Sequence, residues 1–282
     1  MRPLDEYVFD SGTARAARFT CTPGDSRFRD SGPTSNPLVA FPRRSVWIRH
    51  AGKRPFLADP SVATIYNQGQ EYTRSVVSED GDRSEWFAVS PTLAREIAAE
   101  IDPRSQDHPD RPFLKPYAPI DSSLYLRQRL LFSRIERGLV DPLEAEQSII
   151  ELVATVIGCA HGSVPAPRHV RAAESHHDLV QRARALLAGS MSHRFSLGEL
   201  ARALSVSEFH LCRVFREQTG LTLHEFQTEL RLRCGLELLA DTRLDISRIA
   251  MELGFSSHSH FSDTLRRRFS RTPTSIRRSL VS

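Results

Sequence analysis

The last third of the chain contains the same two-helix pattern twice, and this repeat constrains the fold more than any other feature. In the first copy Leu200, Ala201 and Leu204 fall at helical spacing, and Ser205-Val206-Ser207 interrupts the helix. At an offset of about 49 residues, the matching positions are Ile249, Ala250, Leu253 and Phe255. A short helix, a three-residue turn and a second helix with a polar outer face describe a helix-turn-helix unit. The sequence therefore predicts two such units in tandem.

The predicted helices of this region begin at residues that can cap them. Ser196 with Glu199, and Thr222 with Glu225, have the spacing of a capping box, in which the cap and the glutamate satisfy each other's backbone N–H groups. Asp245 can cap the first helix of the second copy. We therefore expect second helices at 207–220 and 257–269, a connecting helix at 223–240 and a short last helix at 274–279.

Positive charge is concentrated in this helical region. Residues 175–282 contain 16 Lys+Arg and 11 Asp+Glu, a net charge of +5, whereas the residues before them carry a net charge of −1. A module that binds the phosphate backbone needs such a local excess of positive charge. The distribution favours a nucleic acid as the partner of the C-terminal part.

These positions resemble the DNA-binding domain of AraC/XylS-type bacterial transcription regulators, over roughly residues 178–278. The matching residues are Leu200-Ala201, Ser207, Leu211, Arg213, Phe215, Gly220, Arg231, Ile249-Ala250, Gly254-Phe255, Ser259, Phe261-Ser262, Arg266-Arg267, Thr272-Pro273 and Arg277. The chain departs from the family at four positions, where Arg, Phe, Gly and Tyr are usual and this chain has Asp263, Leu265, Ser270 and Ile276. A carboxylate at position 263 repels phosphates unless it accepts a hydrogen bond from a cytosine amino group.

The resemblance implies that the second helix of each unit enters a major groove and contacts DNA with its outward side chains. On the first of these helices they are Phe209, Cys212, Arg213 and Arg216, and on the other they are His258, Ser259, Ser262, Asp263, Arg266 and Arg267. Arg213 can bridge guanine O6 and N7, which contributes about 1–3 kcal/mol of discrimination. Arg267 and Arg268 suit phosphate contacts, which position a protein without reading bases. The residues expected in the core are Leu211, Phe215, Phe255, Phe261 and Phe269.

Residues 1–120 predict a β-rich domain. Residues 1–37 have the composition of an irregular segment, and short strands rich in β-branched and aromatic residues follow at 38–41, 45–50, 62–66, 72–77 and 85–89. Many short strands with close turns favour a small barrel or jelly roll, and the family resemblance implies a cupin-like β-barrel at this place. A helix at 91–101 and an extended connection at 102–119 are expected to complete the domain.

Two longer helices are expected next. Asp121 and Asp141-Pro142 are helix start signals, and the helices are expected to end near Gly138 and Gly158. Residues 121–161 would then form an antiparallel hairpin, which we assign to dimerisation or interdomain contact, with packing on its own barrel as the alternative. A proline-containing linker at 162–174 and the DNA-binding domain at 175–282 complete an α+β chain.

Four aromatic residues of the barrel are candidates to line a ligand pocket, namely Trp47, Tyr66, Tyr72 and Trp86; the alternative is that they fill the core. Metal-dependent cupin enzymes carry clustered ligands, whereas this region offers His50 and, beyond its last strand, His108. The cysteines Cys21, Cys159, Cys212 and Cys234 form no C-x-x-C pair. We therefore expect no metal, no cofactor and no catalytic residue, and a cupin-type enzyme fused to a DNA-binding domain is the weaker alternative.

These observations predict a transcription regulator that is not an enzyme, with a small-molecule effector or dimerisation acting through the N-terminal domain. The principal alternative is a ligand-independent regulator controlled by a protein partner. The resemblance implies an activator, because activation is the commoner mode of the family, and it implies double-stranded promoter DNA, a second copy of the chain and RNA polymerase as partners. The chain has no run of 18 apolar residues and no signal-peptide core, so we expect a cytoplasmic, nucleoid-associated protein without membrane contact.

Overall fold

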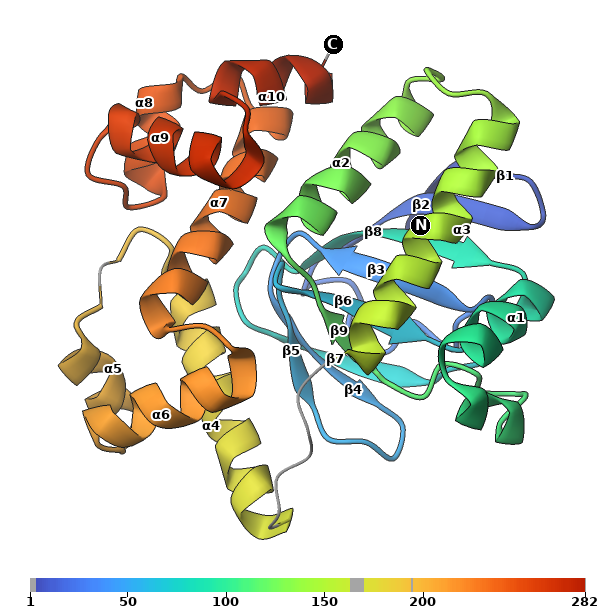
Figure 1. The fold of residues 1–282 in the computed structure, drawn as a ribbon, viewed down its shortest axis with the longest axis horizontal. Coiled ribbons are helices and arrows are strands. Elements are labelled where there is room, and N and C mark those ends of the chain that lie inside the picture. The colour runs from blue at the N-terminus through green and yellow to red at the C-terminus, as the bar shows by residue number, and fades with distance from the viewer. Residues whose placement is uncertain (1–3, 163–169, 194, 282) are drawn as a thin grey trace. The chain divides into compact units, whose positions relative to one another are not determined.

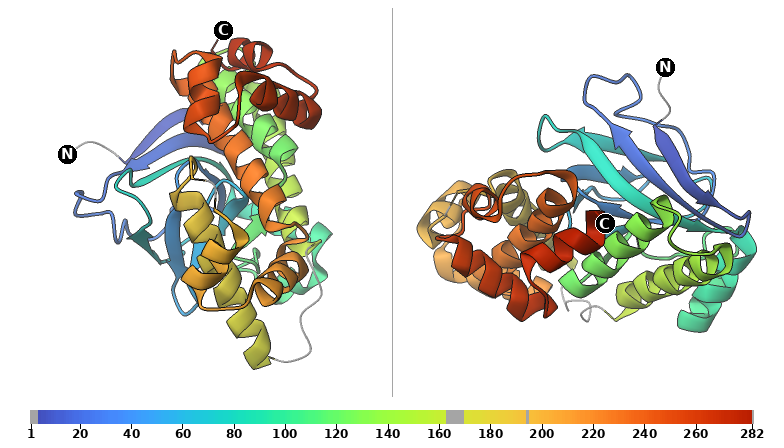
Figure 2. Two further views of the ribbon diagram at one scale, coloured as in Figure 1. Left: turned by 90° about the vertical axis from the view of Figure 1, so that its left-hand side faces the viewer. Right: turned by 90° about the horizontal axis from the view of Figure 1, so that it is seen from above.

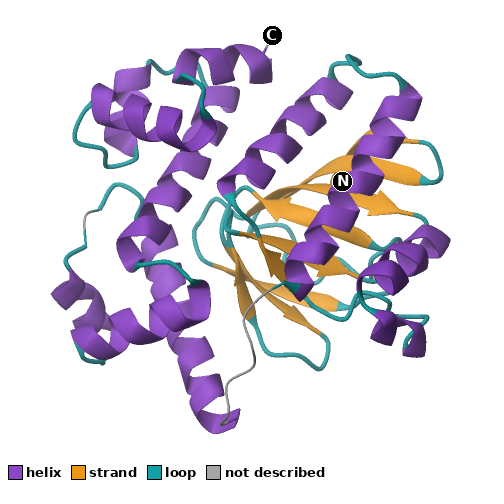
Figure 3. Ribbon diagram, in the orientation of Figure 1, coloured by secondary structure: helices purple, strands orange, loops and turns teal. Residues whose placement is uncertain are grey.

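The computed structural model describes residues 4–162, 170–193 and 195–281, and the chain divides into two compact units at residue 163 (Figure 1). The first unit combines antiparallel strands with helices, and the described part of the second contains helices joined by loops, without strands (Figure 3). The predicted α+β class is confirmed. No helix in the described ranges is both long enough and apolar enough to cross a membrane.

The strands of the first unit form two antiparallel sheets. The six-stranded sheet has the order β1-β2-β8-β3-β6-β9, and the three-stranded sheet has the order β5-β4-β7. The strands are β1 (Asp5–Asp10), β2 (Ala14–Cys21), β3 (Leu38–Pro42), β4 (Val46–His50), β5 (Phe56–Ala58), β6 (Val62–Tyr66), β7 (Tyr72–Val76), β8 (Asp82–Val89) and β9 (Tyr117–Pro119). The five predicted strands are therefore confirmed, while the cupin-like name for their arrangement stays a prediction.

Strand β8 is buried on both faces because it lies between two layers. Trp86 belongs to a cluster that includes Tyr66 and residues of β2, on the side of the three-stranded sheet. The next residue, Phe87, packs edge-on against Phe41 and against Phe132 of helix α2 (Ser122–Glu136). Alternation along one strand thus places successive side chains in two separate cores.

Helices α2 and α3 (Pro142–His161) cover one side of the six-stranded sheet (Figures 1 and 3). Helix α1 (Pro91–Ile101) packs against α3, and a short 3-10 helix, η1 (Pro103–Asp107), follows α1. Asp121 and Asp141 cap α2 and α3, because their side chains accept from Leu124 and Glu144 backbone N–H groups. The predicted hairpin exists and packs on its own sheet, and its role in dimerisation stays a prediction.

A buried carboxylate lies between this sheet and α2. Glu85 on β8 is 0% exposed and is paired with the guanidinium groups of Arg43 and Arg129, which are 3% and 4% exposed. Arg43 donates from Nη1 to Glu85 Oε1 at 3.4 Å, and Arg129 donates to the same oxygen. The carboxylate is stable there only because positive charge and hydrogen bonds replace the water it has lost.

A chain of aromatic rings lies between the two sheets. The ring of Tyr66 lies 4.9 Å from those of Tyr72 and His50, and the ring of Phe56 lies 5.6 Å from His50 and 4.7 Å from Tyr117. His50 is 4% exposed. Burial, with a smaller effect from the positive charge of Lys53, lowers the pKa of His50 to about 4.

The depressed pKa of His50 makes the first unit sensitive to acid. Between the folded pKa of about 4 and an unfolded pKa of about 6.5, the unfolded chain binds more protons, so the free energy of unfolding falls as the pH is lowered through this window. We expect a loss of about 2 kcal/mol from His50 between pH 7 and pH 5. Both tryptophans lie in this unit, so urea unfolding followed by their fluorescence measures it. His50→Gln should lose this share of the pH dependence; equal dependence in both proteins would contradict the assignment.

Several expectations for residues 1–120 are wrong. Residues 1–37 are not irregular throughout, since β1 and β2 lie there, and the connection at 102–119 includes η1 and β9. Strand β2 buries Ala14, Ala16 and Ala17, and alanine has a weak strand propensity that hides the alternation. The short strand β5 was also not predicted.

The second unit consists of seven helices in its described part. They are α4 (Val170–Gly189), α5 (Leu197–Leu204), α6 (Glu208–Thr219), α7 (Leu223–Asp241), α8 (Ile246–Glu252), α9 (His258–Phe269) and α10 (Pro273–Val281). Of the linker predicted at 162–174, residues 163–169 lie outside the described residues, and residues 170–174 are helical and belong to α4. The predicted linker boundary at residue 174 is therefore wrong, because a proline disfavours helix only at and just before its own position, and Pro165 and Pro167 lie before residue 170.

Candidate nucleic-acid interface

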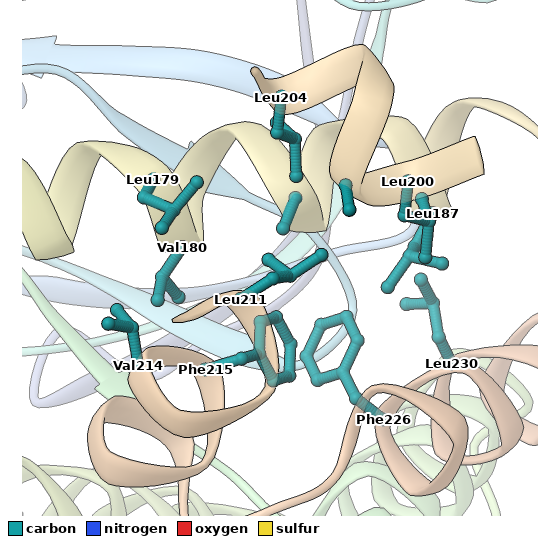
Figure 4. Close-up of a cluster of buried hydrophobic side chains, with 12 residues drawn as sticks. Leu179, Val180, Leu187, Leu200, Leu204, Leu211, Val214, Phe215, Phe226 and Leu230 are labelled. Carbon is teal, nitrogen blue, oxygen red and sulfur yellow. The ribbon is translucent and has the colours of Figure 1, made fainter. Parts of the chain in front are cut away.

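The first helix-turn-helix unit, α5 and α6, is held by one apolar cluster (Figure 4). Figure 4 shows Leu211 and Phe215 of α6 directed toward Leu200 and Leu204 of α5 and toward Phe226 of α7. Leu179, Val180 and Leu187 of α4 close the cluster from the other side. Because one side of α6 is fully used in this core, its opposite side must face outward.

The turns of the two helix-turn-helix units have the same backbone geometry. Ser205 and Gly254 both adopt left-handed conformations, with φ of 58° and 73°. The next residues, Val206 and Phe255, donate their backbone N–H groups to Ala201 and Ala250 at 3.0 and 2.9 Å. The repeat seen in the sequence is therefore a repeat of structure, down to individual hydrogen bonds.

The ends of the second helices also match. Gly220 after α6 and Ser270 after α9 are both left-handed, with φ of 73° and 55°, and each donates to the carbonyl four residues earlier. Ser270 is a departure from the family's usual glycine, and it adopts the glycine-like conformation nonetheless. Two other departures, Leu265 and Ile276, are fully buried, so they are substitutions within the core.

Helix α6 presents the four side chains that the resemblance assigned to DNA. Phe209, Cys212, Arg213 and Arg216 are all exposed, and Phe209 is 78% exposed although it is a large apolar residue. Arg213 donates from Nη1 to both carboxylate oxygens of Glu217, at 2.9 and 3.1 Å. An exposed pair of this spacing contributes only about 0.3–0.5 kcal/mol, so it does not prevent Arg213 from contacting another acceptor.

Helix α9 presents most of its assigned side chains. His258, Ser259, Asp263, Arg266 and Arg267 are exposed. The sixth, Ser262, is only partly exposed, and its hydroxyl oxygen is covered by protein.

Arg268, which was expected to contact phosphate, donates from Nε to both oxygens of Glu229 on α7, at 2.9 and 3.2 Å. It therefore joins α9 to α7. Of the expected core residues, Leu211, Phe215, Phe255 and Phe261 are buried, while Phe269 is only partly buried. Of the α9 side chains assigned to DNA, three charged ones, His258 and Ser259 are therefore exposed.

One residue connects the two helix-turn-helix units, and its role was not predicted from the sequence. Arg231 on α7 is 8% exposed and donates from Nε to Met191 O at 3.0 Å and from Nη2 to His193 O at 2.9 Å. The same guanidinium lies against Gly254 in the turn of the second unit. Arg231 thus ties the segment before α5, the connecting helix and the turn between α8 and α9. Its place in the family pattern was the only sequence signal, because these partners lie far apart along the chain.

Alanine at Gly254 should destabilise the second helix-turn-helix unit by about 2–3 kcal/mol. A left-handed alanine is strained, and the added Cβ would overpack the site. The added Cβ would lie 2.8 Å from Ser192 O and 3.0 Å from Arg231 Nη2. Gly220→Ala is the matched control, since its φ is also 73° but no heavy atom lies within 4 Å of the added Cβ. Hydrogen exchange of peptides from α7 to α9 would measure both effects. Equal losses for the two variants would show that the close approach at Gly254 has no energetic consequence.

The residues proposed as a ligand pocket in the first unit line only a small cavity. Tyr66, Tyr72 and Trp86 border a cavity of about 50 Å³, and Trp47 is not among its lining residues. A water occupies about 30 Å³ of liquid, and small-molecule pockets have about 300–1,000 Å³. Tyr66 and Trp86, which are both buried, therefore fill the core. In the described ranges, no three His, Cys, Asp or Glu side chains are grouped so that they could hold a metal ion.

Comparisons with known proteins agree with this geometry. Residues 200–279 match the family model of a helix-turn-helix domain. Over 79 residues the chain is 46% identical to the transcriptional regulator GlxA of Rhizobium meliloti, which is 28% of this chain and 24% of that protein. Over 91 residues it is 35% identical to the transcriptional activator RhaR of an Enterobacter species, which is 32% of each protein. The chain thus matches no more than about a third of either relative's length.

Among solved structures, the chain is similar to a transcriptional regulator with an AraC-type DNA-binding domain from Chromobacterium violaceum. The likeness has 30% identity and a TM-score of 0.36, and covers 38% of this chain and 96% of that one. The match of residues 200–279 identifies the C-terminal part as an AraC-type helix-turn-helix domain. The family resemblance predicted from the sequence is confirmed.

Proposed function

We propose that this chain is a bacterial transcription regulator, not an enzyme, that reads double-stranded DNA with α6 and α9 in two adjacent major grooves. The observation that carries the proposal is the duplicated helix-turn-helix geometry, with an exposed, arginine-containing face on the second helix of each unit. Arg213 and Arg266 are assigned to base edges, and Arg216 and Arg267 to phosphates. Cytoplasmic location and association with the nucleoid follow from this role.

The length of α7 supports simultaneous binding of both helices. Helix α7 has 19 residues and separates the two helix-turn-helix units (Figures 1 and 2). At about 1.5 Å per residue it spans roughly 28 Å. This length is close to one turn of duplex, about 34 Å, which separates successive major grooves on one side of DNA.

Control of the regulator is assigned to the first unit, through a small molecule or through dimerisation. The side chains of Leu139 and Leu143, at the tip of the hairpin of α2 and α3, are 52% and 74% exposed, which supports a protein contact there. Activation of transcription, with RNA polymerase as a partner, is proposed because the relative RhaR is named an activator. Control by a protein partner without a ligand is the alternative.

Footprinting on genomic fragments, beginning with the DNA that flanks the chain's own gene, tests the proposal. The expected result is two protected stretches about 10–10.5 base pairs apart, centre to centre, for each bound chain. Affinity should fall steeply with salt and should exceed that for a scrambled duplex by about 10³-fold or more. Equal affinity for both duplexes at every salt concentration would overturn sequence-specific regulation.

A further inference from the structure

A second and larger hollow lies in the first unit, away from the aromatic residues that the sequence suggested. It has a volume of about 270 Å³ and is bordered by the end of β4, by β6 with the turn after it, and by the segment 108–116. This volume lies close to the lower limit of about 300 Å³ for small-molecule pockets. We call it the 108–116 cleft.

The walls of the 108–116 cleft are fixed by hydrogen bonds. Asn67 donates from Nδ2 to Phe113 O at 2.9 Å and accepts from Phe113 N at 2.9 Å. Ile65 donates its backbone N–H to Pro116 O at 2.9 Å, and Lys53 donates its own to His50 O at 2.9 Å. The cleft is therefore preformed, so a ligand would not have to order these segments.

The lining of the cleft is positively charged. Lys53, Arg111 and Lys115 border it, and no Asp or Glu does. Within the described ranges, none of these three side chains has an ion-pair partner. Lys53 and Lys115 are the only lysines in the chain, although residues 1–174 carry a net charge of −1. Three cationic side chains without ion-pair partners therefore lie around one cleft, in a part of the chain whose net charge is slightly negative.

A histidine and apolar residues complete the lining. His50 borders the cleft and is 4% exposed, and its Nε2 has no hydrogen-bond partner among the described residues. Ile65 and Phe113 add apolar surface to the same lining.

We propose that the 108–116 cleft binds a small organic anion, with Lys53, Arg111 and Lys115 pairing with its carboxylate or phosphate groups. The apolar lining would contact the carbon skeleton of the ligand. This inference rests on the proposed function, since it makes the anion the effector of the regulator. It places the effector site outside the space between the two sheets, where the aromatic side chains leave too little room.

The two lysines make the site directly measurable in the full-length protein. Amine acetylation, followed by mass spectrometry of the peptides with Lys53 and Lys115, reports the accessibility of each ammonium group. Citrate serves as the carboxylate probe and fructose 1,6-bisphosphate as the phosphate probe, with sodium chloride at equal ionic strength as the control. We expect one probe to slow acetylation of both lysines by about tenfold or more and to bind in calorimetry with a stoichiometry of about one.

Matched variants complete the test. The double variant Lys53→Gln with Lys115→Gln should weaken calorimetric binding by about tenfold or more, because each charge-assisted contact is lost. Arg49→Gln should leave binding unchanged, because Arg49 is exposed on β4 and does not border the cleft. Protection no greater than that by sodium chloride, with neither probe binding in calorimetry, would overturn the proposal. DNA binding measured on the same samples separates the anion site from the proposed regulator. Intact operator binding without anion binding would contradict only the effector site.

Discussion

Alanine at both Arg213 and Arg266 is expected to weaken binding to the mapped operator by about 30-fold to 20,000-fold. Each arginine is exposed on the outward face of its helix, one in each helix-turn-helix unit. A bidentate contact between arginine and guanine contributes about 1–3 kcal/mol of discrimination, and losses at well-separated sites add. The pair that Arg213 makes with Glu217 contributes too little to change this expectation.

The measurement is a titration of operator and scrambled duplexes at several salt concentrations. The double variant should lose affinity for the operator far more than for the scrambled duplex. Arg182→Ala is the matched control, because Arg182 is exposed on α4 and lies in neither helix-turn-helix unit. If the double variant weakens both duplexes equally, the two arginines contact phosphates and do not read bases.

Glu85→Ala is expected to destabilise the first unit by about 3–5 kcal/mol, which is the typical cost of removing one partner of a buried ion pair. The variant removes the carboxylate that Arg43 and Arg129 share, and both arginines are almost fully buried. Both guanidinium groups would then lose this shared acceptor between β8 and α2. A loss of this size is a large part of the 5–15 kcal/mol that typically stabilises a domain.

Urea unfolding followed by tryptophan fluorescence measures this effect, since Trp47 and Trp86 both lie in the first unit. Glu136→Ala is the control, because it removes an ion pair with Arg18 from a site where the Glu136 side chain is 37% exposed. We expect the control to cost about 0–1 kcal/mol. A loss at Glu85 as small as that at Glu136 would mean that water enters the cluster and solvates the arginines.

The helices of the second unit could be predicted from local chemistry. Ser196, Ser207, Thr222, Asp245 and Ser257 all accept a backbone N–H in the first turn of the helix that they precede. Capping is decided within four residues, so one sequence is enough to find it. The outward positions on α6 followed from the same periodicity, since the buried side of a helix leaves the other side exposed.

Features that depend on distant partners could not be predicted. Arg231 resembles any helical arginine until the carbonyl groups of Met191 and His193 are placed beside it. Glu85 follows the polar residues Asp82, Arg83 and Ser84 in β8, and only the packing of α2 reveals that its face is buried. The 108–116 cleft likewise joins residues about 60 positions apart, whose strand pairing no local signal indicates.

The bonds from Arg231 have a further consequence for the DNA sites that the protein can accept. The Arg231 guanidinium binds carbonyl groups in the segment before α5 and lies against the turn between α8 and α9. It therefore holds α6 and α9 at a set separation and rotation. One base pair inserted between the two contacted stretches would shift them by about 3.4 Å and rotate them by about 34° relative to each other. The protein would therefore reject a site with correct bases at the wrong interval, so the distance between the two half-elements is itself part of the recognised signal.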